Sequence, residues 1–92
     1  MAKVIVTLKI MPGSPDSDLD AIEKQAKRFI AEFAGEGETR TQITPIAFGL
    51  KEIRILFVMD EKIGTTDPLE QKISDMDDVN SVEVVDVRRA LG

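Results

Sequence analysis

The order in which strand-like and helix-like hydrophobic patterns follow one another constrains this chain most strongly. Four stretches are rich in β-branched residues or alternate apolar with polar side chains, as strands do: residues 3–11, 39–47, 51–60 and 79–87. Two other stretches place apolar residues three or four apart, as helices do: residues 18–34, and a shorter one with Leu69, Ile73 and Met76. The predicted order is therefore strand, helix, strand, strand, helix, strand.

This order predicts the fold class. Right-handed crossovers, with a hairpin joining the two halves, give an α+β, ferredoxin-like βαββαβ sandwich. We expect a four-stranded antiparallel sheet with two helices on one face. Pro45 cannot donate a hydrogen bond to a ladder, so its strand belongs at an edge, and the expected spatial order is last, first, third, second strand.

Local signals predict the element ends and the faces of the last strand. Asp16, Ser17 or Asp18 can cap the first helix, and Thr66 or Asp67 the second. Residues 51–60 become apolar on both faces toward their end, which indicates a central strand. If side chains alternate strictly along the last strand, Val82, Val84 and Asp86 lie on one side of the sheet. Val85 and Val87 then lie on the other side.

Composition limits the chemistry. The chain has 92 residues, which predicts one domain over residues 1–92. It contains no His, Cys, Trp or Tyr, so imidazole catalysis, thiol nucleophiles, disulfides and His- or Cys-ligated metals are excluded. An acidic group, residues 75–78, lacks the spacing of a calcium loop. We expect a small binding module that is not an enzyme and has no cofactor and no metal.

Charge is unevenly distributed along the chain. The formal net charge is −5, and residues 60–78 alone carry seven acids and two lysines. Small basic groups remain at Arg40, Lys51 and Arg54 and at Arg88 and Arg89. Such unevenness is typical of a solvated acidic helix face, or of a partner surface with a basic edge.

Two classes of partner are not expected. The acidic balance, and a sheet with only Phe57 to stack bases, argue against direct nucleic-acid binding. No window approaches the about 18–20 apolar residues of a membrane span, so no membrane partner is expected and a cytoplasmic location is the default.

The most pointed local feature is the hairpin tip Phe48-Gly49-Leu50-Lys51. Either Phe48 folds back onto the sheet, or it protrudes as an aromatic anchor that fills a pocket of a partner. Gly49 would let another backbone approach, and Lys51 adds a cation. Arg88 and Arg89 are either solvated or, if they lie beside the hairpin, part of a cationic patch suited to an acidic partner.

Three segments carry a resemblance to a known family: residues 6–10 with Asp18-Leu19, the hairpin of residues 44–51, and residues 79–84. The proline–aliphatic–small–Phe-Gly–aliphatic–Lys pattern of the hairpin is the most specific. Over essentially its whole length, the chain resembles the archaeal elongation factor 1-beta family and the C-terminal exchange domain of the eukaryotic counterpart.

The resemblance implies a guanine-nucleotide exchange factor that promotes GDP release from elongation factor 1-alpha, and a ferredoxin-like fold. It implies that Phe48 buries in this GTPase. It also puts Arg89 at the position of a family lysine that reaches the Mg²⁺ and phosphate region of the partner. The alternative is a ligand-binding or regulatory ferredoxin-like domain, a class that is usually dimeric through a sheet edge or face.

Overall fold

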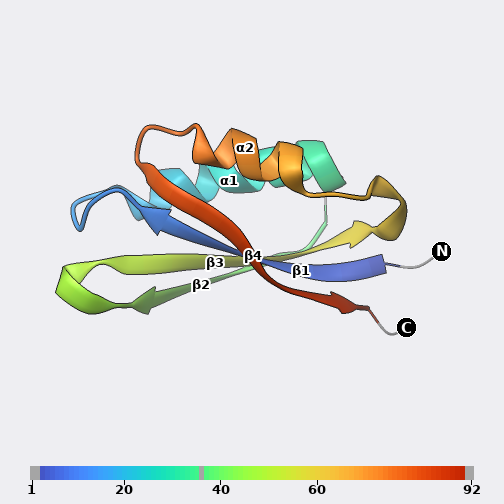
Figure 1. Cartoon of the computed structure of the whole chain (residues 1–92), viewed down its shortest axis with the longest axis horizontal. Helices are drawn as coiled ribbons and strands as arrows, with labels where there is room; N and C mark the ends of the chain where they lie inside the picture. The colour runs from blue at the N-terminus through green and yellow to red at the C-terminus, as the bar shows by residue number, and fades with distance from the viewer. Residues whose placement is uncertain (1–2, 36, 91–92) are drawn as a thin grey trace.

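A computed structural model describes residues 3–35 and 37–90 of the chain. It has the predicted element order (Figure 1): β1 (Lys3–Pro12), α1 (Leu19–Ala34), β2 (Thr39–Pro45), β3 (Lys51–Asp60), α2 (Asp67–Ser74) and β4 (Val79–Arg89). Two short helical turns, η1 (Ala47–Gly49) and η2 (Glu61–Ile63), flank β3. The α+β, ferredoxin-like prediction is confirmed.

The sheet is antiparallel in the order β2-β3-β1-β4, as expected. Pro45 ends the edge strand β2, and β3 lies in the interior of the sheet between β2 and β1. Both helices lie on the same side of the sheet, so its other side is open (Figure 1). The β2–β3 hairpin is at one end of the molecule, and the C-terminal end of β4 is at the opposite end.

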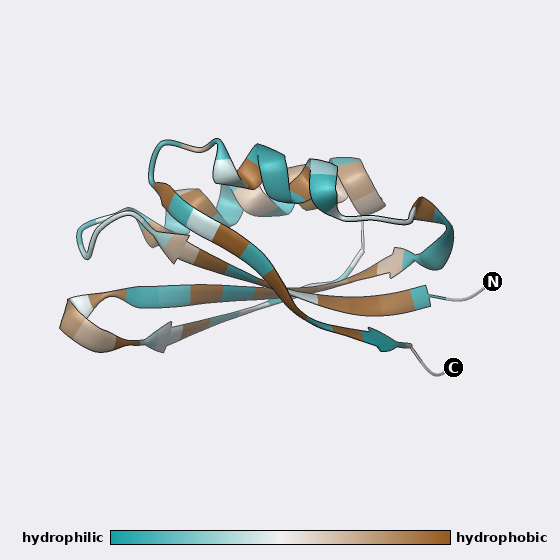
Figure 2. Ribbon diagram, in the orientation of Figure 1, coloured by the Kyte–Doolittle hydropathy of each residue, from teal (hydrophilic) through white to brown (hydrophobic). Residues whose placement is uncertain are grey.

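The core fills the space between the helices and the sheet. Alternation along the strands is visible as bands of apolar and polar residues (Figure 2). Among the described residues, thirteen apolar side chains form this core: Val6, Leu8, Ile10, Ile22, Ala26, Ile30, Ile53, Ile55, Phe57, Met59, Leu69, Ile73 and Val79. Each of the larger ones contributes about 1.5–3 kcal/mol when it leaves water, which holds the helices against the sheet.

The helix ends follow local chemistry. Asp18 caps α1, because its side chain accepts a hydrogen bond from the Ala21 backbone N–H. On the surface of α1, the Lys27 ammonium lies 2.9 Å from the Glu23 carboxylate and lowers the pKa of Glu23. Thr66 stands at the cap position of α2 without capping a backbone N–H; its hydroxyl donates instead to Glu70 at 2.8 Å.

The predicted faces of β4 are wrong for its second half, because the strand contains a β-bulge. Thr7 pairs with Asp86 and Leu8 with Val84, so Val85 is an extra residue in the ladder. Beyond the bulge, Val87 lies opposite Val6 on the helix side, and Asp86 lies on the open side. The bulge thereby decides the faces of the residues that follow it.

Candidate functional site

The hairpin tip is built by a tight turn with an unusual backbone. Phe48 has φ 62° and ψ 31°, and Gly49 has φ 77°. The Leu50 N–H donates to the Ala47 carbonyl at 3.2 Å, and the Ile46 N–H donates to the Leu50 carbonyl at 2.8 Å. Two central residues with positive φ define a type I′ turn, in which Asn-Gly is the usual pair. Here phenylalanine takes the place of asparagine.

This turn directs the Phe48 side chain into solvent. Phe48 is 93% exposed, more than any other large apolar residue of the described chain, and it does not fold back onto the sheet. The left-handed backbone costs a residue with a Cβ roughly 1–2 kcal/mol. Both features oppose folding of the free protein, which is the pattern of a side chain held for a partner.

The hairpin tip has close neighbours from the β1–α1 loop. A Cβ on Gly49 would lie 3.7 Å from the Cβ of Pro15. In the same loop, the Gly13 N–H donates to the Asp78 carbonyl at 2.7 Å, which ties it to the turn between α2 and β4. Pro15 is not among the site residues that the sequence predicts. The antiparallel pairing of β1 with β3 is the signal that would have found it, since that pairing brings the end of β1 to the start of β3.

The surroundings of Phe48 are acidic. The two loops beside the hairpin tip, β1–α1 and α2–β4, carry five exposed carboxylates: Asp16, Asp18, Asp75, Asp77 and Asp78. Lys51 is the only exposed cation of the hairpin tip. The basic group of Arg40, Lys51 and Arg54, which is close together in the sequence, is therefore not gathered at the hairpin tip. Arg40 and Arg54 lie on the open side of the sheet, opposite Leu56 and Gln42 respectively, and not at the tip.

The two terminal arginines lie far from the hairpin. Both are at the end of β4, at the opposite end of the sheet from Phe48 (Figure 1), so the predicted cationic patch with the hairpin does not form. They also face opposite sides. Arg88 is opposite Ile5 on the open side, with its Nε 2.9 Å from Asp86 Oδ2. Arg89 is opposite Val4 on the helix side, with its Nη2 3.8 Å from Glu61 Oε1.

Two kinds of feature are absent from the described residues. Across residues 3–35 and 37–90, no cluster of three or more carboxylate, His or Cys side chains is arranged to hold a metal ion. None of the helices in these ranges is long and apolar enough to cross a membrane.

The fold and the site define a small α+β domain with an exposed aromatic side chain at one end. Residues 5–90 match the family described as the EF-1 guanine nucleotide exchange domain. Elongation factor 1-beta of Methanothermobacter thermautotrophicus is 37% identical over 99% of this chain and 100% of its own length. The elongation factor 1-beta of Methanosphaera stadtmanae is 38% identical over 99% of this chain and 100% of its own length. The elongation factor 1-beta of Staphylothermus marinus is 38% identical over 97% of this chain and 98% of its own length.

Among solved structures, the de novo designed protein Foldit4 matches with a TM-score of 0.64 at 16% identity, over 98% of both chains. A likeness at that identity shows the fold alone. The matches in sequence show the family, and this chain belongs to the EF-1 guanine nucleotide exchange domain family. It is thus a nucleotide exchange factor of translation elongation.

Proposed function

We propose that this chain accelerates GDP release from elongation factor 1-alpha, and that Phe48 is its principal anchor on that GTPase. Family membership supports the activity. The observation that carries the role of Phe48 is its 93% exposure on a turn whose backbone disfavours it. Such a factor works in the cytoplasm with the translation machinery and needs no catalytic residue of its own.

The mechanism is a coupling between two binding equilibria. An exchange factor lowers GDP affinity by binding the open GTPase more tightly than the GDP-bound one. Each tenfold loss of GDP affinity requires about 1.4 kcal/mol of such differential binding. Burying Phe48 in a partner pocket supplies about 1.5–3 kcal/mol, so one side chain is sufficient for a tenfold effect or more.

The rigid turn supports this role. Because Phe48 already points into solvent in the free protein, little reorganisation is needed before it enters a pocket. Gly49 has no side chain to obstruct the approach of a partner backbone, Leu50 adds apolar area beside it, and Lys51 adds a flexible cation.

The C-terminal end of β4 is the second proposed contact. It lies at the other end of a molecule 42 Å long, so the partner must receive Phe48 and the arginines at two separate places. Arg89 is the residue proposed to act near the phosphates and the Mg²⁺ ion. Its contact with Glu61 is 3.8 Å long and exposed, so releasing it costs little. Arg88, on the other face, contributes positive charge.

The test is release of labelled GDP from archaeal elongation factor 1-alpha, with wild-type protein and with Phe48→Ala. We expect acceleration by the wild type and a loss of at least tenfold for the variant, with thermal stability nearly unchanged. Ile43→Ala is the matched control, because Ile43 is 43% exposed on β2 and lies away from the tip. No acceleration by saturating wild-type protein refutes the function; equal effects of the two variants refute the anchor.

A further inference from the structure

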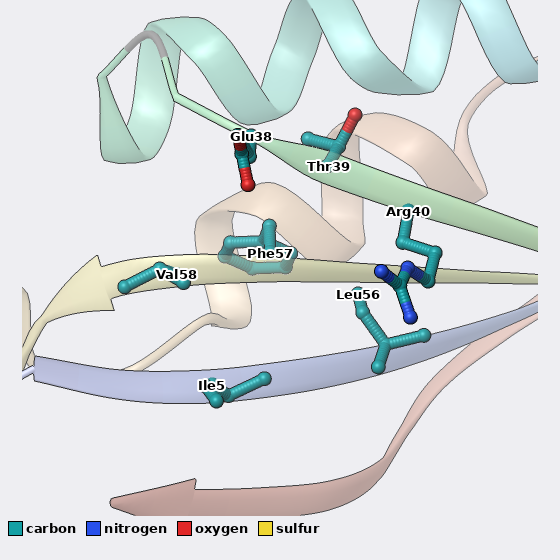
Figure 3. A pocket seen from close by; sticks show the side chains of 7 residues that line it. All are labelled: Ile5, Glu38, Thr39, Arg40, Leu56, Phe57 and Val58. Atoms are coloured by element: carbon teal, nitrogen blue, oxygen red, sulfur yellow. The ribbon is translucent and has the colours of Figure 1, made fainter. Parts of the chain in front are cut away.

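Apart from Arg88 at its border, the open side of the sheet is a surface that the proposed function does not use. Its centre is apolar: Ile5 and Leu56 are half-buried, while Val58 and Val85 remain 42% and 39% exposed. Two shallow hollows flank this apolar strip, and both are lined by Ile5 and Leu56. One has a volume of about 530 Å³ and is bordered by Glu38 and Arg40 (Figure 3).

Charged side chains border the strip in an ordered way. Across the sheet, one row runs Val58, Ile5, Arg88, and Glu38 lies on its β2 side, where it borders the same hollow as Val58. The next row runs Arg40, Leu56, Thr7, Asp86. An acid on the β2 side therefore shares a row with a base on the β4 side, and the order is reversed in the neighbouring row.

We propose that this open face binds a second copy of the same chain. A twofold axis parallel to the strands, between β3 and β1, exchanges the β2 side of one copy with the β4 side of the other. Arg40 then faces Asp86 of the second copy, and Glu38 faces Arg88 of the second copy. The two apolar strips meet at the axis, so the surface is complementary to itself in both charge and polarity.

The available area is sufficient for a weak dimer. Four strands about 4.8 Å apart, each contributing about ten residues of about 3.4 Å, give a face of about 650 Å². Two such faces bury about 1,300 Å², near the lower end for specific complexes. Two twisted sheets pack in this way with their strands within about 30° of each other.

One like-charged pair is formed and is compensated within each chain. In the third row, Arg54 faces Lys9 of the second copy. Arg54 already pairs with Glu52 of its own chain, and Lys9 Nζ lies 2.8 Å from Glu83 Oε1. The hairpin tips lie at one end, outside the paired faces, so Phe48 stays free in both copies.

Sedimentation equilibrium tests the proposal, with concentrations up to about 1 mM, where weak self-association becomes populated. The mass of the wild type is expected to rise from 10.2 kDa toward twice that value. Arg40→Asp should raise the dimer Kd at least tenfold, because it puts like charges together twice in each dimer. Asp86→Arg should do the same, and the double variant should recover to within about threefold.

The matched control is Lys51→Asp, which makes the same charge change at the hairpin tip and should leave the dimer Kd unchanged. Circular dichroism establishes that every variant is folded. A wild type that stays at 10.2 kDa throughout overturns the proposal. So does a double variant that fails to recover. A monomeric wild type whose Arg40→Asp variant loses affinity for elongation factor 1-alpha would assign the face to that partner instead.

Discussion

At the scale of single residues, Phe48 shows a conflict between folding and binding. The turn it occupies favours Asn or Gly, because those residues enter the left-handed region at the lowest cost. Phenylalanine bears that cost and exposes an aromatic ring to water as well. Nothing in the packing of the free protein requires it there. The proposed partner pocket would supply the physical reason for its presence, and the residue can be exchanged without touching the core.

Phe48→Asn should therefore separate stability from activity. The left-handed conformation is easier for Asn, so we expect the free energy of unfolding to rise by about 1 kcal/mol. Stimulation of GDP release should fall as far as in Phe48→Ala, because the ring is gone from both. Urea unfolding and labelled-GDP release measure the two effects. A variant that is more stable and still fully active would show that the ring is not the anchor.

At the scale of elements, the β-bulge in β4 determines where the terminal charges point. If Val85 were absent, Asp86 would follow Val84 directly, and side chains would alternate between the two faces along the whole second half of the strand. Regular pairing would then join Leu8 to Val84 and Thr7 to Asp86, which are the partners already present. The bulge therefore accommodates Val85 while Asp86 keeps the open side and Val87 the helix side; uninterrupted alternation through Val85 would reverse these two faces.

Deletion of Val85 is expected to be tolerated. It should change the free energy of unfolding by less than about 1 kcal/mol, since Val84, Asp86 and Val87 keep their faces. Deletion of Val82 is the contrast: it moves Glu83 into the place opposite Ile10, on the helix side, and should cost about 2–4 kcal/mol. Thermal and urea unfolding compare the two deletions. Equal losses would mean that the extra residue is structurally required.

At the scale of the whole molecule, the hairpin end is the acidic one. Exposed carboxylates surround Phe48, whereas the opposite end mixes the two signs, with Lys3, Arg88 and Arg89 near Glu38 and Glu61. The total of −5 conceals this arrangement, because the acids near the hairpin come from loops that are distant in sequence. A partner that receives Phe48 should present a basic surface around its pocket, and long-range attraction should then orient the encounter.

Neutralising two of these acids should slow association. The double variant Asp77→Asn/Asp78→Asn is expected to reduce the association rate with elongation factor 1-alpha several-fold at low salt, with little effect at about 1 M salt, where charges are screened. The control removes two exposed acids at the other end, through Glu32→Gln/Glu38→Gln, and should slow association less. Stopped-flow kinetics at several salt concentrations decide this; faster association of the first variant would contradict it.

The sequence by itself determined the element order and the edge position of β2. These follow from hydrophobic spacing and from Pro45, and both act locally, since the period of a strand or helix depends only on nearby residues. The hairpin could be singled out in the same way, because an aromatic residue beside Gly49 is conspicuous in any tight turn.

Only the tertiary structure decided where the functional groups stand relative to one another. The face of Asp86 depends on pairing with β1, because a bulge is a property of two strands. The distance of Arg88 and Arg89 from Phe48 depends on the direction of β4 in the sheet, and the acids around Phe48 come from two loops that are distant in sequence. The charge of a sequence segment does not show which charged residues become neighbours in space. The sheet creates those neighbours, because its strands reverse direction and bring distant segments together.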